Sequence, residues 1–283
     1  ISSAVKRVTN VGDRVVLLTP VYDIFYHSVE NAGRTVLESR LSYRNGEYDI
    51  DFYDLEKKLS DPLCTMMILC NPHNPVGKIW TPDELADIGE LCRRHGVTVL
   101  SDEIHCDLTD PGFGYTPFAS VSEDCRDNSI TCIAASKAFN LAGLQSAAVI
   151  IPDEFLRAKV VRGLNSDEVA EPNCFAPIAT VAAFREGGEW LDALREYLAE
   201  NKRVATEFIK EKIPEIRVTP GEATYLLWLD CERLAENTDS LRDFIRETTG
   251  LYLSAGSPYR GDGAHFLLFS SPGSPPRSFH CFF

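Results

Sequence analysis

Short runs of apolar residues recur along the first half of the chain, separated by segments in which apolar positions have helical spacing. The runs are VVLLT at 15–19, MMILC at 66–70, VTVLS at 97–101, ITCIA at 130–134 and AAVII at 147–151. Continuous apolar strands of this kind are typical of a sheet that helices cover on both faces. The pattern therefore predicts an α/β fold with a mostly parallel sheet sandwiched by helices.

One of the segments between these runs carries clear helix boundary signals. Residues 81–96 read TPDELADIGELCRRHG. Thr81 is the predicted N-cap, Pro82 suits the first turn, and Glu84 completes a capping box. Gly96 is the predicted end of the helix. Together with the strands on either side, this helix predicts a βαβ unit in a doubly wound sheet.

After Pro152 the pattern changes to longer and more polar helices. The clearest helical spacing covers residues 189–212, and apolar runs follow at 225–230 and 251–256. A short helix is expected between those two runs, around residues 239–249. This combination predicts a smaller α+β unit after the α/β sheet.

We accordingly expect two domains, with the boundary inside the long helix. The large domain covers residues 1–190 and the small C-terminal domain covers residues 191–283. Residues 271–283, SPGSPPRSFHCFF, are rich in Ser and Pro and then aromatic, without helical or strand periodicity. We expect them to form a disordered tail. Their composition is what a shift of reading frame would produce, a hypothesis that resequencing the gene tests.

Composition narrows the range of ligands and surroundings. The 283 residues are 44% hydrophobic and 25% charged, which is an ordinary globular composition. Lys and Arg number 28 against 42 Asp and Glu, a net charge of −14, so nucleic acid held by a basic surface is a poor expectation. No apolar run approaches the roughly 20 residues of a membrane span. The nine cysteines are scattered without a CxxC pair, which favours a reducing cytoplasm and argues against zinc.

Polar motifs follow three of the predicted strands directly. NPHNPVG (71–77) follows the second run, SDEIH (101–105) closes the third, and ASKAFNLAG (135–143) follows the fourth. The carboxyl ends of parallel strands meet at one edge of a sheet, where α/β proteins bind their ligands. We therefore expect one site there. A dinucleotide site is not favoured, because no GxGxxG follows the first strand.

Each motif contains a residue with a chemical use. Lys137, flanked by small residues, could form a Schiff base with a carbonyl compound. Asp102 could keep a pyridinium nitrogen protonated, so that the ring withdraws electrons. Asn74 could donate its side-chain amide to a phenolate oxygen. Taken singly, each residue more often has no functional role, and Asp102 and Asn74 are then ordinary turn or cap residues, but the combination in this order favours a site.

The three motifs resemble the signatures of fold-type I pyridoxal-phosphate enzymes, the aspartate-aminotransferase superfamily of class I and II aminotransferases. The sequences of the motifs NPHNPVG, SDEIH and SKAFNLAG are most similar to those of the cystathionine β-lyase-like C–S lyases of the MalY/PatB group. The resemblance runs from about Ile1 to Tyr259. It implies pyridoxal 5'-phosphate as the cofactor, a small amino-acid substrate and a homodimer.

The resemblance also implies roles for individual residues around the cofactor ring. Lys137 would hold the cofactor and then move the substrate Cα proton. Asp102 would pair with the pyridine nitrogen and Asn74 with the ring hydroxyl oxygen. Tyr22, in TPVYDIFY, would stack on the ring, and His105 would lie near the ring hydroxyl.

Other implied contacts concern the phosphate and the substrate carboxylate. Ser136 would touch the phosphate, and Ile1 and Ser2 match the edge of a phosphate-binding turn. We expect the rest of that turn, and the N-terminal segment that precedes it in relatives, to be missing from this sequence. Relatives carry a carboxylate-binding Arg where this chain has Leu268. Arg260 is a candidate replacement.

These observations leave three functions open. The subgroup resemblance favours a C–S β-lyase, which eliminates a thiol from cysteine S-conjugates and yields pyruvate and ammonia. A pyridoxal-phosphate-dependent aminotransferase of amino acids is the alternative, because its first steps are the same. The third is a truncated, inactive relative, since the N-terminal segment and the carboxylate-binding Arg are both lacking.

Overall fold

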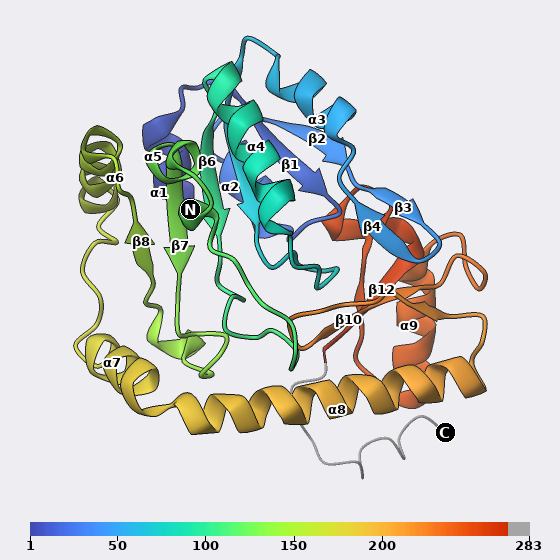
Figure 1. Ribbon diagram of the computed structural model, residues 1–283. Helices are drawn as coiled ribbons and strands as arrows, with labels where there is room; N and C mark the ends of the chain where they lie inside the picture. The colour runs from blue at the N-terminus through green and yellow to red at the C-terminus, as the bar shows by residue number, and fades with distance from the viewer. Residues whose placement is uncertain (271–283) are drawn as a thin grey trace.

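The computed structural model describes residues 1–270, and a six-stranded sheet lies at the centre of its first half (Figure 1). The strand order is β2-β1-β5-β6-β7-β8, with β8 antiparallel to β7 and the other neighbours parallel. Its strands are β1 (Arg14–Thr19), β2 (Thr35–Arg40), β5 (Cys64–Cys70), β6 (Thr98–Asp102), β7 (Ser129–Ile133) and β8 (Ala148–Ile150). The predicted mostly parallel sheet is therefore confirmed.

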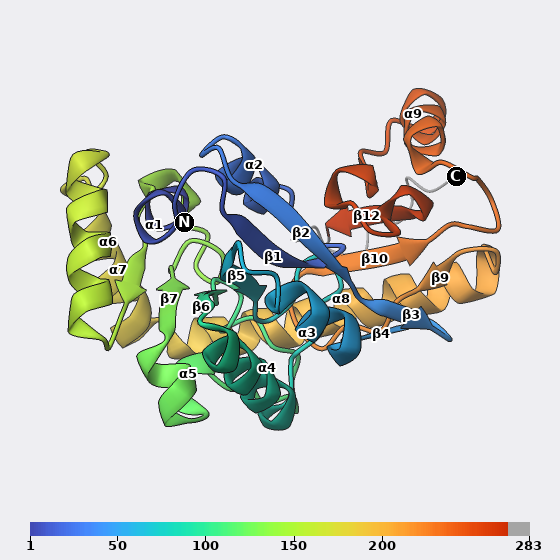
Figure 2. The same cartoon turned by 90° about the horizontal axis from the view of Figure 1, so that it is seen from above.

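Helices cover both faces of this sheet, as expected (Figure 2). One face packs on α3 (Phe52–Leu59) and α4 (Pro82–His95), the other on α1 (Ser2–Val8), α2 (Ile24–Glu30) and α6 (Glu154–Ser166). Side chains of a strand alternate between faces, and in β1 Val16 contributes to the first core while Val15 and Leu17 contribute to the second. Both faces of the strand are thus buried, which explains its continuous apolar sequence.

The α4 helix has the boundaries that its sequence signals predict. The Thr81 hydroxyl accepts a hydrogen bond from the backbone N–H of Glu84 at 3.2 Å, and the Glu84 carboxylate accepts one from the backbone N–H of Thr81 at 2.8 Å. Gly96 ends the helix with a left-handed φ of 69°. Strands β5 and β6 on either side are parallel, so the βαβ unit is confirmed.

A second, antiparallel sheet follows in the order β11-β12-β10-β9. Its strands are β9 (Arg217–Val218), β10 (Leu226–Asp230), β11 (Ser254–Ala255) and β12 (Phe266–Ser270). The helices of this half are α7 (Ala176–Glu186), α8 (Gly188–Lys212) and α9 (Thr238–Thr249). In Figure 1, α8 runs beneath the molecule from α7 to the side of α9. The α+β character of this half agrees with the expectation.

A hairpin from the first half also packs against the second sheet. It consists of β3 (Ser42–Arg44) and β4 (Glu47–Asp49). Tyr48 of β4 lies in the same core cluster as Trp228 and Phe266, and its hydroxyl accepts a hydrogen bond from Trp228 Nε1 at 3.2 Å. The cluster thus joins the two sheets, and a domain division at residue 190 stays a prediction. The predicted tail, 271–283, lies outside the described residues.

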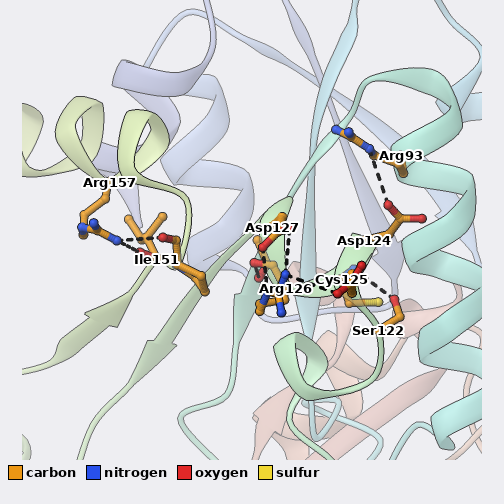
Figure 3. A network of polar contacts seen from close by, with 11 residues as sticks. Arg93, Ser122, Asp124, Cys125, Arg126, Asp127, Ile151 and Arg157 are labelled. Atoms are coloured by element: carbon orange, nitrogen blue, oxygen red, sulfur yellow. Dashed lines mark hydrogen bonds and ion pairs between the residues drawn. The ribbon is translucent and has the colours of Figure 1, made fainter.

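The amino ends of the parallel strands carry surface polar contacts around α5 (Glu123–Asp127) (Figure 3). Arg93 of α4 forms an ion pair with Asp124 at 3.6 Å, and Arg126 pairs with Asp127 at 2.7 Å. Exposed pairs of this kind contribute little stability. The sequence motifs follow the strands, so they lie at the opposite edge of the sheet, at the carboxyl ends of the strands.

Two general features of the described residues complete the fold. Within residues 1–270, no helix combines the length and the apolar character that crossing a membrane requires. The eight cysteines in this part of the chain are all free thiols.

Candidate active site

A cavity of about 350 Å³ lies at the carboxyl ends of the parallel strands. Six of the residues expected from the sequence line it: Tyr22, Asn74, Asp102, His105, Ser136 and Lys137. They follow or close four strands, β1, β5, β6 and β7, that are neighbours in the sheet. The structure therefore brings together Tyr22, Asn74, Asp102 and Lys137, which are 28 or more positions apart along the chain. Cys70, Gln145 and Ser146 line the same cavity and were not expected from the sequence.

Asp102 is a buried carboxyl group in the floor of the cavity. Its Oδ1 accepts one hydrogen bond, from the backbone N–H of Ile104 at 3.2 Å. Burial raises the pKa of Asp102 to about 6, and the positive charge of Lys137 acts in the opposite direction. A desolvated carboxylate is stabilised by a cationic partner. Asp102 thus fits a protonated ring nitrogen.

Two other polar atoms in the cavity are buried without a partner. Among the described residues, neither Asn74 Oδ1 nor His105 Nδ1 has a hydrogen bond. Most buried polar atoms are hydrogen-bonded, so these two mark places where a polar ligand would complete the site. Burial lowers the pKa of His105 to about 4, with Lys137 adding to the effect, so the imidazole is neutral near pH 7.

Lys137 lies in a turn directly after β7. The turn is closed by hydrogen bonds from the backbone N–H of Phe139 to the carbonyl of Ala135 at 3.0 Å and from Leu141 to Ser136 at 3.1 Å. Lys137 lowers the pKa of both Asp102 and His105 through its charge, so its ammonium group lies within electrostatic range of both. The cavity therefore combines an amine, a carboxyl group and a neutral imidazole.

The Tyr22 segment is fastened to the loop that carries Asn74. The backbone N–H of Tyr22 donates to the carbonyl of Asn74 at 3.2 Å. His73, fully buried, forms a hydrogen bond through Nε2 to the carbonyl of Pro20 at 2.8 Å. Burial lowers the pKa of His73 to about 4, so the neutral ring donates this bond from Nε2. No role for His73 was predicted from the sequence, although its place inside NPHNPVG is a usable signal.

The two residues expected at the phosphate lie at the start of α1. Ile1 packs against the core cluster that includes Cys70 and Cys132, near the carboxyl ends of β5 and β7. The Ser2 hydroxyl donates to Ser28 of α2 at 3.0 Å. Neither Ile1 nor Ser2 is among the cavity-lining residues, and their role at a phosphate stays a prediction.

Arg260 is not brought to the cavity. Its guanidinium forms an ion pair with Glu30 at 2.6 Å and lies over the ring of Tyr26, 4.1 Å from the centroid. Because Glu30 already neutralises it, its position does not support the expected contact with a substrate carboxylate. Leu268 is 8% exposed and packs in the core shared by the two sheets.

The described residues contain no group of three or more His, Cys, Asp or Glu side chains arranged to hold a metal ion. The donors that do converge are an amine, a carboxyl group, an amide and an imidazole. This set matches an organic ligand with a carbonyl carbon, a basic ring nitrogen and a ring oxygen better than it matches a metal.

Comparisons with known proteins place nearly the whole described chain in a family context. The family model for class I and II aminotransferases matches residues 1–266. The chain is 45% identical over 271 residues to cystathionine beta-lyase PatB of Bacillus subtilis, covering 96% of this chain and 70% of that protein.

Two solved structures extend the comparison. Cystalysin from Treponema denticola, which contains a pyridoxal 5'-phosphate cofactor, is 31% identical with a TM-score of 0.94, covering 96% of this chain and 69% of that one. The PLP-bound C–S lyase of Staphylococcus hominis is 29% identical with a TM-score of 0.90, covering 99% of this chain and 72% of that one.

Proposed function

The chain belongs to the class I and II aminotransferase family, and from this premise we propose that it is a pyridoxal-phosphate-dependent C–S β-lyase. The cofactor supplies a carbonyl carbon for covalent attachment and a ring that withdraws electrons from a bound amino acid. The observation that carries the proposal is the cavity in which Lys137, Asp102 and Asn74 converge. The choice of lyase rests on the 45% identity to a cystathionine beta-lyase.

Four side chains would hold and tune the cofactor. Asp102 would keep the ring nitrogen protonated, because a carboxylate buried among apolar groups is stabilised by that cation. Asn74 would donate its side-chain amide N–H to the ring oxygen, and the buried Nδ1 of His105 would find a partner among the polar groups beside that oxygen. Tyr22 would cover one face of the ring. Each of these roles uses a property already present in the protein: burial, an unpartnered atom or an aromatic surface.

Lys137 would hold the cofactor covalently and then act as the base of the reaction. Its amine would take the proton from the substrate Cα, which requires the neutral amine at that moment. Loss of that proton allows a thiolate to leave from Cβ, and hydrolysis then gives pyruvate and ammonia. Return of the proton to a different carbon would give transamination, so proton delivery by Lys137 separates the lyase from the aminotransferase.

We further propose a homodimer in a reducing cytoplasm. Free thiols in the described residues support the reducing compartment. The α7 region supports the dimer, because Phe175 and Ile178 are 70% and 71% exposed there. Exposed apolar side chains that gather on one helix often mark a protein interface. Analytical ultracentrifugation of the purified chain tests the dimer directly.

Absorbance and product analysis test the enzyme activity. Saturating pyridoxal phosphate should produce a new absorbance band that is absent in Lys137→Ala and retained in Lys159→Ala, an exposed lysine on α6. With cystathionine as substrate, the wild-type protein should release pyruvate and a thiol. Amino-group transfer to a keto acid without thiol release would favour the aminotransferase. Absence of the band in the wild type would contradict cofactor binding and favour an inactive relative.

A further inference from the structure

The loop between β9 and β10 reaches from the second sheet to the site. Two of its backbone N–H groups, of Glu222 and Ala223, donate to the carbonyl of Gly77 at 2.8 and 3.0 Å. Gly77 is the last residue of NPHNPVG, the motif that carries Asn74. The loop is therefore fastened to one of the segments that supply cavity residues.

The same loop is also fastened to the segment that follows His105. The backbone N–H of Thr224 donates to the carbonyl of Leu108 at 2.7 Å, and that of Asp110 donates to the carbonyl of Glu222 at 2.8 Å. Thr109 forms an additional β-bridge with Ala223. One loop thus clamps the Asn74 and His105 segments together.

Two backbone conformations show how closely these segments fit. Gly77 has a φ of +77°, and a Cβ there would meet the carbonyl oxygen of Ala223 at 2.8 Å, so only glycine allows this approach. Thr224 has a φ of +71°, which is rare for a β-branched residue. Thr224 is 1% exposed, and its hydroxyl accepts a hydrogen bond from the N–H of Leu226 at 3.2 Å. A strained residue persists where its surroundings hold it.

This bend at Thr224 directs the next residue, Tyr225, toward the site. The Tyr225 ring meets the His105 ring edge to face, with centroids 6.1 Å apart and planes at 67°. Tyr225 also packs on the small core cluster of Leu108, Ala138 and Leu198. Ala138 is the residue that follows Lys137 in the sequence. It therefore bridges the second sheet, the long helix α8 and the cavity wall.

The His105 side chain has an aromatic neighbour but an unpartnered ring nitrogen. Its Nδ1 is buried and has no hydrogen-bond partner among the described residues, so that atom does not fix the ring. The charged group that acts on the imidazole is Lys137. The Tyr225 ring is an aromatic contact of His105 that comes from outside the first sheet.

We propose that Tyr225 is a positioning residue, which the 220–225 loop brings from the second sheet to hold the His105 imidazole in the cavity wall. The inference rests on the proposed function, because His105 is assigned to that same site. Tyr225 acts through its ring rather than its hydroxyl, so phenylalanine should replace it and an aliphatic residue should not.

The test compares Tyr225→Leu with Tyr225→Phe by NMR of the imidazole resonances in the cofactor-free protein. The His105 signals are identified by their loss in His105→Gln. In Tyr225→Leu they should shift, and the pKa of His105 should rise because water reaches the ring. Tyr225→Phe should resemble the wild type. Tyr53→Leu, which replaces a tyrosine that is 82% exposed, is the matched control and should leave the signals unchanged.

Affinity for pyridoxal phosphate provides a second readout. Tyr225→Leu should bind it about three- to tenfold more weakly, the range expected for one edge-to-face aromatic contact. Tyr225→Phe should bind pyridoxal phosphate with the affinity of the wild type. If Tyr225→Leu does not fold, as judged by circular dichroism, Tyr225→Met takes its place with the same expectations.

Unchanged His105 signals in the aliphatic variant would overturn the proposal. Equal shifts in the aliphatic variant and Tyr225→Phe would overturn it as well, because the ring would then not be the group that matters. A wild-type protein that binds no pyridoxal phosphate would refute the proposed function instead. The NMR comparison needs no cofactor and still decides the role of Tyr225 in that case.

Discussion

Replacing Asp102 with asparagine should make the cofactor-free protein more stable and the site less able to bind its cofactor. The side chain keeps its shape but loses its charge. Asp102 is 7% exposed, and its one hydrogen bond, from the N–H of Ile104, can also be accepted by an amide oxygen. The main change is therefore removal of a desolvated carboxylate.

The magnitude follows from the pKa of Asp102, which burial raises from 3.8 to about 6. A rise of about 2 units corresponds to about 3 kcal/mol of lost stability when the carboxyl group is ionised. The new amide N–H₂ group lacks an assigned partner, which costs about 1 kcal/mol. The net gain for Asp102→Asn should be about 2 kcal/mol near neutral pH.

The sign of the pH dependence follows from the same shift. A raised folded-state pKa means that the native protein binds the proton more tightly than the unfolded chain does. The wild-type protein therefore loses this contribution as pH rises from about 4 to about 6, and the loss is complete above that window. The stability difference between variant and wild type should be about 2 kcal/mol larger at pH 7.5 than at pH 4.

Urea denaturation of both proteins without cofactor, at these two pH values, measures this difference. Asp87→Asn, at an exposed position on α4, is the control and should show no comparable change. With pyridoxal phosphate added, the order should reverse, because a neutral amide cannot pair with a protonated ring nitrogen. An Asp102→Asn protein less stable than the wild type at pH 7.5, or a difference independent of pH, would refute the reasoning.

Further predictions concern the loops that hold the site. Gly77→Ala should lower the melting temperature strongly, because its Cβ would meet the carbonyl oxygen of Ala223 at 2.8 Å. Gly114→Ala, which meets no atom within 4 Å, should change it little, and equal effects would contradict the close approach. His73→Phe should cost about 1–3 kcal/mol in denaturant unfolding, because the carbonyl of Pro20 loses its buried donor. His73→Gln should recover part of that loss, and no difference between the two would show that the hydrogen bond contributes little.

Much of the first sheet could be predicted from the sequence because its signals are local. Strands buried on both faces require continuous apolar residues, and α4 carries its own start and stop residues between Thr81 and Gly96. Strand β2 was not predicted, because it is an edge strand with a mixed sequence, TVLESR, and partial exposure. Strand β12 was not predicted as a strand either, since its pairing with β10 and β11 depends on residues up to 44 positions away.

Some features of the candidate site, like some of the fold, could be predicted from the sequence, and others could not. By itself, the sequence determined which residues follow the parallel strands, and parallel strands end at one edge, so Asn74, Asp102 and Lys137 were expected together. Only the tertiary structure decided that Arg260 pairs with Glu30 and does not line the cavity, and that Tyr225 meets His105 from the loop before β10. The physical reason is range: strand runs and helix caps are encoded within a few residues. An ion pair or ring contact between distant segments depends on how the whole chain packs.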